Sequence, residues 1–168
     1  VLVQGAATND FSEFDLSSPS LSPFEITVSA APAAGDDAFL LIDTTANATH
    51  LIRDSVTFSA DDYVFYLDIK PFTGGQARNV GVIFNNGQGA LFNPVDGSVM
   101  NTLGAPTILA PIVLTDGGIR VGFTVLQPAI TTEARVYLGD GTVWTSAWMG
   151  DGLSGAYARR PQVERSSF

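Results

Sequence analysis

Few side chains in this sequence could act in acid–base catalysis. Acidic pairs stand at Asp36–Asp37 and Asp61–Asp62, and His50 is the sole histidine. A glycosidase needs two carboxyl groups about 5–10 Å apart across a cleft, and neighbours within one loop do not show such a separation. Solvated turn acids are the simpler interpretation, and a lone histidine beside a strand pattern is more often structural than catalytic. We therefore expect no catalytic residues and no enzymatic activity.

The sequence also offers no recognisable metal or cofactor motif. It contains no cysteine, which excludes disulfides, thiolate metal ligands and cysteine nucleophiles. Loops around Asp140 and Asp151 could present oxygen atoms to calcium, but they lack the alternate acids of a calcium-binding loop. The glycine-rich segments are not followed by a helical pattern, as phosphate-binding loops are. We expect neither a metal ion nor a cofactor.

Aromatic side chains are the best candidates for binding. Trp144 and Trp148 lie four residues apart in "GTVWTSAWMGDG". Flat rings near loops can stack on the C–H faces of sugars while neighbouring polar groups bond the hydroxyls. The alternative is that both tryptophans plug the end of the fold. Tyr66 and Asp68 form the best polar pair on a strand face, and the four residues together are our predicted glycan-binding set.

The elements that must position these residues follow a period of two. In "IRVGFTV" (119–125) and "DYVFYLDIKP" (62–71), apolar and other residues alternate, which is typical of strands with one buried face. Similar segments cover residues 24–30, 38–44, 50–58, 79–84, 90–93, 107–114 and 134–138. Asn-Gly, Asp-Gly and Gly-Gly pairs between the segments suit tight turns. The sequence predicts an all-β protein, an antiparallel β-sandwich or jelly roll, with no ordinary amphipathic helix.

Bulk composition narrows the partners. The chain has 168 residues, enough for one domain with a real core, and 45% of them are hydrophobic. Its formal charge of −9 repels phosphate backbones, which argues against nucleic acid as a partner. No apolar run approaches the roughly 18 residues that span a bilayer, so we expect no membrane insertion.

The two ends of the chain look different from the middle. Residues 1–23 are rich in Ser, Pro and Asn, with isolated aromatics. We predict an extended N-terminal arm there and a single sandwich domain over residues 24–168. From Arg159 onward the charges alternate in sign, and we expect this last segment to leave the core.

Several segments together resemble one family. The C-terminal run contains "ARVYLGDG" (134–141), then "WMGDGLSGAY" (148–157), then "RRPQVE" (159–164) with Gln162 and Glu164. This order is similar to the C-terminal signature of a jelly-roll domain of bacteriophage head spikes, head fibres and tail fibres, which is related in shape to carbohydrate-binding modules.

Earlier segments resemble the same family. They are "NDFSEFD" (9–15), the hairpin over residues 49–71, "ALFNPVDGSV" (90–99) and the strand 119–125. The match at 119–125 lacks the family's aromatic pair, and Pro161 interrupts its terminal pattern. By this resemblance, the glycines of "GDGLSG" belong to turns and hold no phosphate.

The resemblance implies a non-enzymatic protein on the virion surface, of head spike or fibre type, that recognises host surface polysaccharide. Its partners would be virion proteins, a host surface glycan and copies of itself, most simply in a trimer. A second hypothesis is a capsid decoration protein that clamps capsid subunits. A third is the carbohydrate-binding module of a secreted glycosidase.

Overall fold

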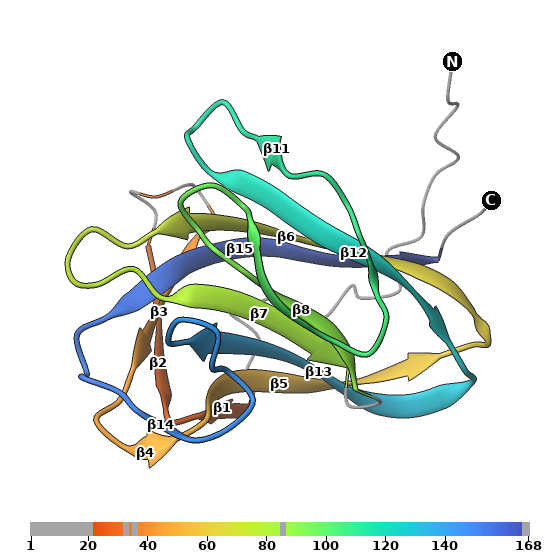
Figure 1. The fold of residues 1–168 in the computed structure, drawn as a ribbon, viewed down its shortest axis with the longest axis horizontal. Helices are drawn as coiled ribbons and strands as arrows, with labels where there is room; N and C mark the ends of the chain where they lie inside the picture. The colour runs from red at the N-terminus through yellow and green to blue at the C-terminus, as the bar shows by residue number, and fades with distance from the viewer. Residues whose placement is uncertain (1–21, 32–33, 35–36, 85–86, 166–168) are drawn as a thin grey trace.

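In the computed structural model the chain folds into two antiparallel β-sheets that pack face to face (Figure 1). The structure describes residues 22–31, 34, 37–84 and 87–165. The predicted arm lies outside this part of the chain except for its last two residues, which belong to the first strand. Within the described residues there is no α-helix, and so none that is long and apolar enough to cross a membrane.

Two larger sheets and one small ladder contain the strands. Sheet I has the spatial order β1 (Ser22–Phe24), β5 (His50–Phe58), β13 (Ile130–Gly139), β7 (Asn79–Phe84), β8 (Gln88–Phe92) and β9 (Val99–Leu103). Sheet II has the order β10 (Thr107–Ile108), β12 (Ile119–Gln127), β6 (Asp61–Pro71), β15 (Gly155–Arg165), β3 (Phe39–Asp43) and β2 (Ile26–Ala30), and β11 (Ile112–Val113) also pairs with β12. The short strands β4 (Asn47–Ala48) and β14 (Trp148–Met149) pair with each other.

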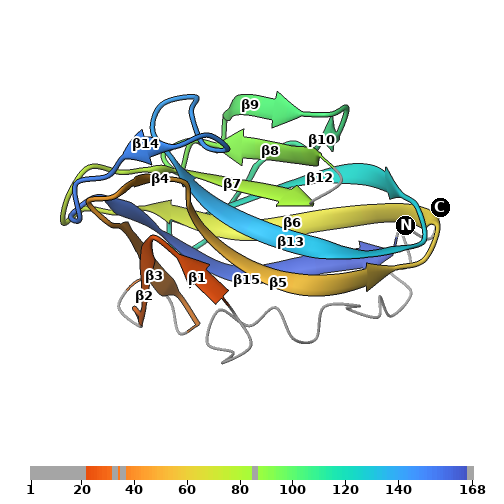
Figure 2. The same ribbon diagram turned by 90° about the horizontal axis from the view of Figure 1, so that it is seen from below.

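The prediction of an antiparallel β-sandwich is confirmed. Figures 1 and 2 show the long strands β5, β13, β6 and β15 running along the length of the molecule. Along β6 and β12, every second side chain is buried between the sheets, as the period of two predicts. The buried set on these two strands is Tyr63, Phe65, Leu67, Ile69, Ile119, Val121, Phe123 and Val125.

The expectation that the chain leaves the core after Arg159 is wrong. Residues 155–165 form β15, an inner strand of sheet II that lies between β6 and β3. Ala158 and Val163 point into the core, and the charged residues that suggested a tail occupy the other face. The register with β6 shifts between Arg159 and Gln162, where Arg160 has a φ of 50°. Such a β-bulge tolerates Pro161 inside an inner strand.

Smaller differences concern short strands. The predicted segment 107–114 is divided into β10 and β11, with Pro111 between them. The strands β4, β9 and β14 fall in segments for which the pattern of apolar residues predicted none. The polar character of β9 fits its position, because it is the edge strand of sheet I and its outer side chains are exposed.

Glu25 marks the point at which the chain passes from one sheet to the other. It stands between β1 of sheet I and β2 of sheet II, and its φ is 49°. The Nδ1–H of the buried His50 donates a hydrogen bond to its carbonyl oxygen at 2.5 Å, and the backbone N–H of Thr44 donates to the same oxygen at 3.2 Å. The only histidine therefore holds a strained corner, as its structural interpretation predicts.

The packing of Phe123 gives a test of the strand register. Its ring lies 5.6 Å from Phe65 and 6.0 Å from Phe84, between centroids, in the middle of the core. Phe123→Ala should lower the free energy of unfolding by about 3–5 kcal/mol, because it leaves a cavity that the sheets cannot close. Thr124→Ala, on the outer face of the same strand, should change it by about 0.5 kcal/mol or less. Urea unfolding measures both, and equal losses would show that the register is wrong.

Candidate functional site

The structure separates the four predicted glycan-binding residues. Trp144 and Trp148 are 1% and 7% exposed. Neither ring can offer a flat face to a sugar, so the expectation of two exposed stacking tryptophans is corrected here. Tyr66 and Asp68 lie on the outer face of sheet II, and only the tyrosine ring is partly accessible. The four side chains do not form one site.

Trp144 packs on the outer face of sheet I, away from the space between the sheets. Its ring completes a satellite apolar cluster with Leu51, Ile83, Leu91 and Tyr137. Two glycines make room for it. A Cβ atom at Gly81 would lie 2.2 Å from the indole, and one at Gly139 would lie 3.1 Å from the Cβ of Trp144.

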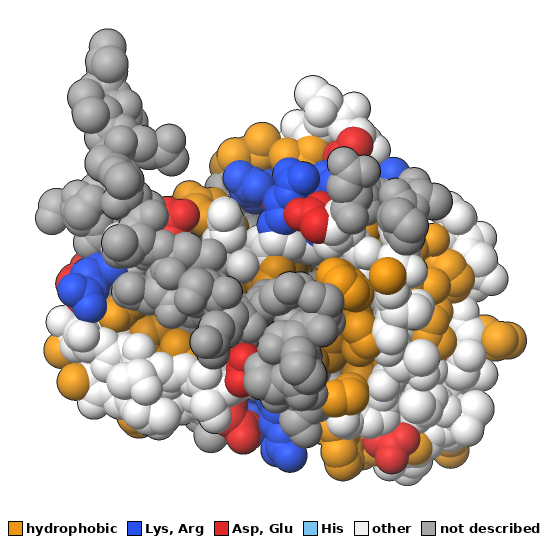
Figure 3. All heavy atoms as spheres, turned by 180° about the vertical axis from the view of Figure 1, so that it is seen from behind, with side chains coloured by type: hydrophobic (Ala, Val, Ile, Leu, Met, Phe, Trp, Pro, Cys, Tyr) orange, Lys and Arg blue, Asp and Glu red, His pale blue; other side chains and the backbone are white. Residues whose placement is uncertain are grey.

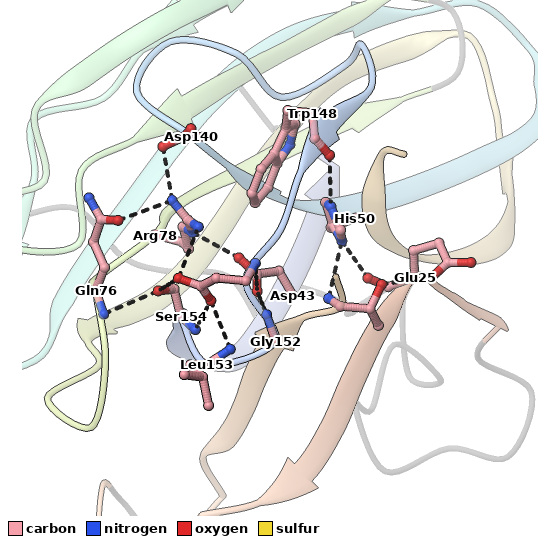
Figure 4. Close-up of polar contacts among 12 residues, drawn as sticks. Glu25, Asp43, His50, Gln76, Arg78, Asp140, Trp148, Gly152, Leu153 and Ser154 are labelled. Atoms are coloured by element: carbon pink, nitrogen blue, oxygen red, sulfur yellow. Dashed lines mark hydrogen bonds and ion pairs between the residues drawn. The ribbon is translucent and has the colours of Figure 1, made fainter. Parts of the chain in front are cut away.

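Trp148 lies at one end of the core and is held between two polar side chains. The centroid of the His50 ring is 4.3 Å from that of the indole. The guanidinium carbon of Arg78 is 4.7 Å from the indole centroid, a cation–π contact. The ring therefore separates the histidine from a buried ionic cluster (Figure 4).

Arg78 is the centre of this cluster. The residue is buried, and its guanidinium points at three carboxylates: Asp43 and Asp140 at 2.9 Å, and Asp151 at 3.5 Å. Gln76 Oε1 accepts a further bond at 3.3 Å. Within the described residues, no group of three His, Asp or Glu side chains could hold a metal ion. The guanidinium itself stands between the carboxylates of this cluster.

The loop with the sequence "GDGLSG" is folded by the same carboxylates. Asp43 Oδ1 accepts the backbone N–H groups of Asp151 and Gly152 at 3.2 and 2.9 Å. Asp151 in turn accepts bonds from the Ser154 hydroxyl and from the N–H groups of Leu153 and Ser154. The hydroxyl bond, followed by the backbone bonds, holds the pKa of Asp151 well below its usual range. The acid between the glycines fixes a turn, and β15 begins directly after it.

The outer face of sheet II is different, because charged and aromatic side chains lie together there. Asp68 on β6 is 1% exposed and accepts two bonds from Arg120 on β12, at 2.7 and 3.1 Å. The bidentate bond raises the pKa of Arg120 above its usual value. The guanidinium carbon of Arg120 lies 6.0 Å from the centroid of the Tyr66 ring. That ring packs over Gly122, where a Cβ atom would lie 2.8 Å from it.

Arg159 extends this row of charges onto β15. Its Nε lies 3.9 Å from Asp68, and its Nη2 forms an ion pair with Asp116. The backbone N–H of Gly118 and then Arg159 keep the pKa of Asp116 below its usual value. Arg160, the strained residue of the bulge, bonds Asp37 at 2.7 Å. Each arginine of this face is thus fixed by at least one carboxylate.

A small pocket opens beside this row. It is shallow, and its enclosed space is about 10 Å³. Small residues, among them Ala38 and Gly118, also line it. Its polar and aromatic lining consists of Asp68, Lys70, Tyr157 and Arg159. The Tyr157 ring is held edge-on against Phe72, 5.6 Å between centroids.

Sequence reasoning found Tyr66 and Asp68 but missed most of this face. The alternation of the segment 62–71 already places Lys70 on the outer face with Tyr66 and Asp68, but Lys70 was not included in the predicted binding set. Tyr157 alternates with the buried residues Ala156 and Ala158, so it could also have been placed on the outer face. Arg159 was missed because its segment was interpreted as a tail. The sequence signals that Trp144 packs against sheet I were Gly81 and Gly139, since a glycine inside a strand often marks a close approach by another group.

The satellite cluster on sheet I predicts the effect of removing its indole. Trp144→Ala should lower the free energy of unfolding by about 3–5 kcal/mol, whereas Val143→Ala, at an exposed neighbour, should cost about 0.5 kcal/mol or less. Thermal or urea unfolding of the two variants is the measurement. An exposed stacking residue would tolerate the change, so an unaltered stability of Trp144→Ala would refute this placement.

The buried ionic cluster yields a second prediction. Asp43→Asn keeps the shape of the side chain but leaves the Arg78 charge without its fully buried partner, which typically costs about 3–5 kcal/mol. Asp140→Asn removes a partner whose side chain is 53% exposed, and should cost about 1 kcal/mol or less. Urea unfolding near neutral pH compares them. If Asp140→Asn proved the more damaging variant, Asp43 would not be the principal partner of Arg78.

Comparison with known proteins gives no family assignment. No family model matches the chain, and no curated protein matches it. Among solved structures, a similar one is a carbohydrate-binding module, TmCBM27, described in a study of specific mannan recognition. The TM-score is 0.40 at 11% sequence identity, over 91% of this chain and 95% of that one. The resemblance to phage spike and fibre domains stays a prediction from the sequence.

Proposed function

We propose that this domain binds a glycan without catalysis, through the outer face of sheet II. The observation that supports the proposal is the row of fixed hydrogen-bonding groups between two partly accessible tyrosine rings, Tyr66 and Tyr157. Rings of this kind can pack against the C–H face of a sugar, and the guanidinium groups between them can bond its hydroxyls.

The spacing of the two rings suits an extended ligand. Tyr157 on β15 pairs with Lys70 on β6, and Lys70 is four residues from Tyr66 on the same strand. At about 3.4 Å per residue, the two rings are therefore on the order of 14 Å apart along the strands. A chain of sugar units that crosses β6 and β15 would reach both rings and the charges between them.

The ion pairs hold the side chains of this surface in place without a ligand. Arg120 is fixed by two bonds to Asp68, and Arg159 by Asp116. Side chains that are already ordered lose less conformational entropy on binding, and this favours affinity. The strained φ of Arg160 in the bulge is a further indication of function, because such strain persists only where the surroundings enforce it.

The same pairing supports binding without catalysis. A general acid or base must exchange protons with a substrate, but Asp68 is buried against Arg120, and Asp116 is paired with Arg159. In Figure 3, several blue side chains on the visible face lie beside red ones. The buried His50 is occupied at the Glu25 corner.

The biological setting belongs to the proposal as well. The resemblance of the sequence to phage spikes and fibres supports display on a virion surface as a trimer, with host polysaccharide as the ligand. Attachment to a secreted glycosidase is equally consistent with the fold, and capsid decoration is the remaining hypothesis. The position of the protein in a density map of an intact particle, or its absence from the particle, distinguishes these settings.

Removal of one ring tests the proposed surface. Tyr66→Ala should weaken binding to a glycan found on an array by about ten- to a hundredfold, because a central aromatic contact is lost. Tyr66→Phe keeps the ring and should retain most of the affinity. Phe24→Ala, at an exposed ring on β1 of sheet I, is the matched control and should bind normally.

Isothermal titration with the array-selected glycan measures these affinities, and thermal unfolding verifies that each variant is folded. If Tyr66→Ala is folded and binds like the unaltered protein, the outer face of sheet II is not the site. If no glycan on the array binds to the unaltered protein, the proposed function itself fails.

A further inference from the structure

Lys70 differs from every other basic residue that the structure describes. All eight Lys and Arg residues of the chain fall in the described ranges. The seven arginines each have a described carboxylate within 4.0 Å, whereas Lys70, the single lysine, has none there. Its printed partner is the carbonyl oxygen of Asp116, at 3.1 Å.

Lys70 is one of the residues that line the pocket on the outer face of sheet II. An ammonium has three N–H donors, and the bond to the Asp116 carbonyl uses one of them. Tyr157 and Arg159 from β15 border the same pocket. The pocket thus combines an apolar ring with a cation that has donors to spare.

Among the described residues around the pocket, the charges cancel in pairs except for this one. Asp68 is matched by Arg120, and Asp116 by Arg159. Arg160 is matched by Asp37. Within the described residues the positive charge of Lys70 is what remains, in a chain whose formal net charge is −9.

We propose that this pocket takes the anionic group of an acidic sugar, with Lys70 as its counter-ion and the Tyr157 ring against the sugar. The inference rests on the proposed function and specifies its ligand class. The enclosed space is only about 10 Å³, roughly what one water molecule needs, so the anionic group alone enters it while the sugar ring stays at the mouth and the rest of the glycan follows the sheet toward Tyr66. A compact ammonium pairs with a carboxylate or a sulfate as a point charge.

The bulge in β15 supports this assignment independently. Arg160 has a φ of 50° and pairs with Asp37, while Arg159 next to it borders the pocket and pairs with Asp116. Bulges commonly re-aim side chains beside functional sites. Here Arg159 reaches Asp68, Asp116 and Asp37, and Arg160 pairs with Asp37 as well.

The test compares acidic polymers with neutral polymers of the same backbone. The probes are polygalacturonate, alginate and hyaluronan, each beside its carboxyl-reduced form, and dextran sulfate beside dextran. Binding is measured in about 0.15 M salt, where the Debye length of about 8 Å screens the repulsion between the negative domain and a polyanion. We expect at least one acidic polymer to bind about tenfold or more tightly than its neutral partner.

Three variants test whether the preference for the acidic form arises at the pocket. Lys70→Gln should abolish the ratio between the acidic and the neutral form, and Lys70→Arg should retain most of it. Arg53→Gln removes one positive charge from a partly exposed ion pair on sheet I, and should leave the ratio unchanged. Thermal unfolding shows whether each variant is folded.

The outcomes separate this inference from the proposed function. If the acidic and reduced forms of every polymer bind equally, or if Lys70→Gln keeps the ratio, the inference is wrong while glycan binding stands. If Arg53→Gln lowers the ratio as much as Lys70→Gln, the preference arises from net charge and the pocket is not its source. A preference for the sulfated arm alone identifies sulfate, and a preference for a uronate polymer identifies carboxylate.

Discussion

The buried carboxylate of Asp43 fixes the part of the fold on which the proposed site depends. One of its oxygens receives Nε of Arg78, and the other receives two backbone N–H groups of the loop that leads into β15. Arg78 stands just before β7 of sheet I, whereas Asp43 ends β3 of sheet II. One side chain therefore ties both sheets to the loop, and the loop sets where β15 starts.

The position of β15 decides the chemistry of the outer face. Its register against β6 brings Arg159 opposite Asp68 and Tyr157 opposite Lys70. A slip by one residue would turn Ala158 and Val163 outward and the charged side chains into the core. A buried ion pair is often a weak source of stability, but here the Asp43 carboxylate also satisfies backbone donors, so its principal contribution is to specify one arrangement of the loop.

The sequence predicted the strands well where both faces of the alternation are clear. In β6 and β12 the apolar residues mark the inner face, because each strand lies inside sheet II and packs on sheet I. Prediction failed where long-range pairing decides the outcome. The charged residues of β15 look like a solvated tail until β6 and β3 are placed on either side of them. The sequence left open whether Trp144 is exposed or buried, because the loop that contains it folds back over sheet I and only Gly81 and Gly139 indicate that contact.

The candidate site was predicted only in part, again because contacts between residues far apart in the sequence decide its geometry. Alternation places Tyr66 and Asp68 on the outer face, but it does not show that Arg120, 52 positions away in the sequence, buries the carboxylate. The same partner changes what Asp68 can do. A free carboxylate would contact a ligand directly, whereas one held by Arg120 and approached by Arg159 orders two guanidinium groups. In the proposed site Asp68 then acts by positioning those donors, and Lys70 beside it is the one cation of this face that has no carboxylate partner among the described residues.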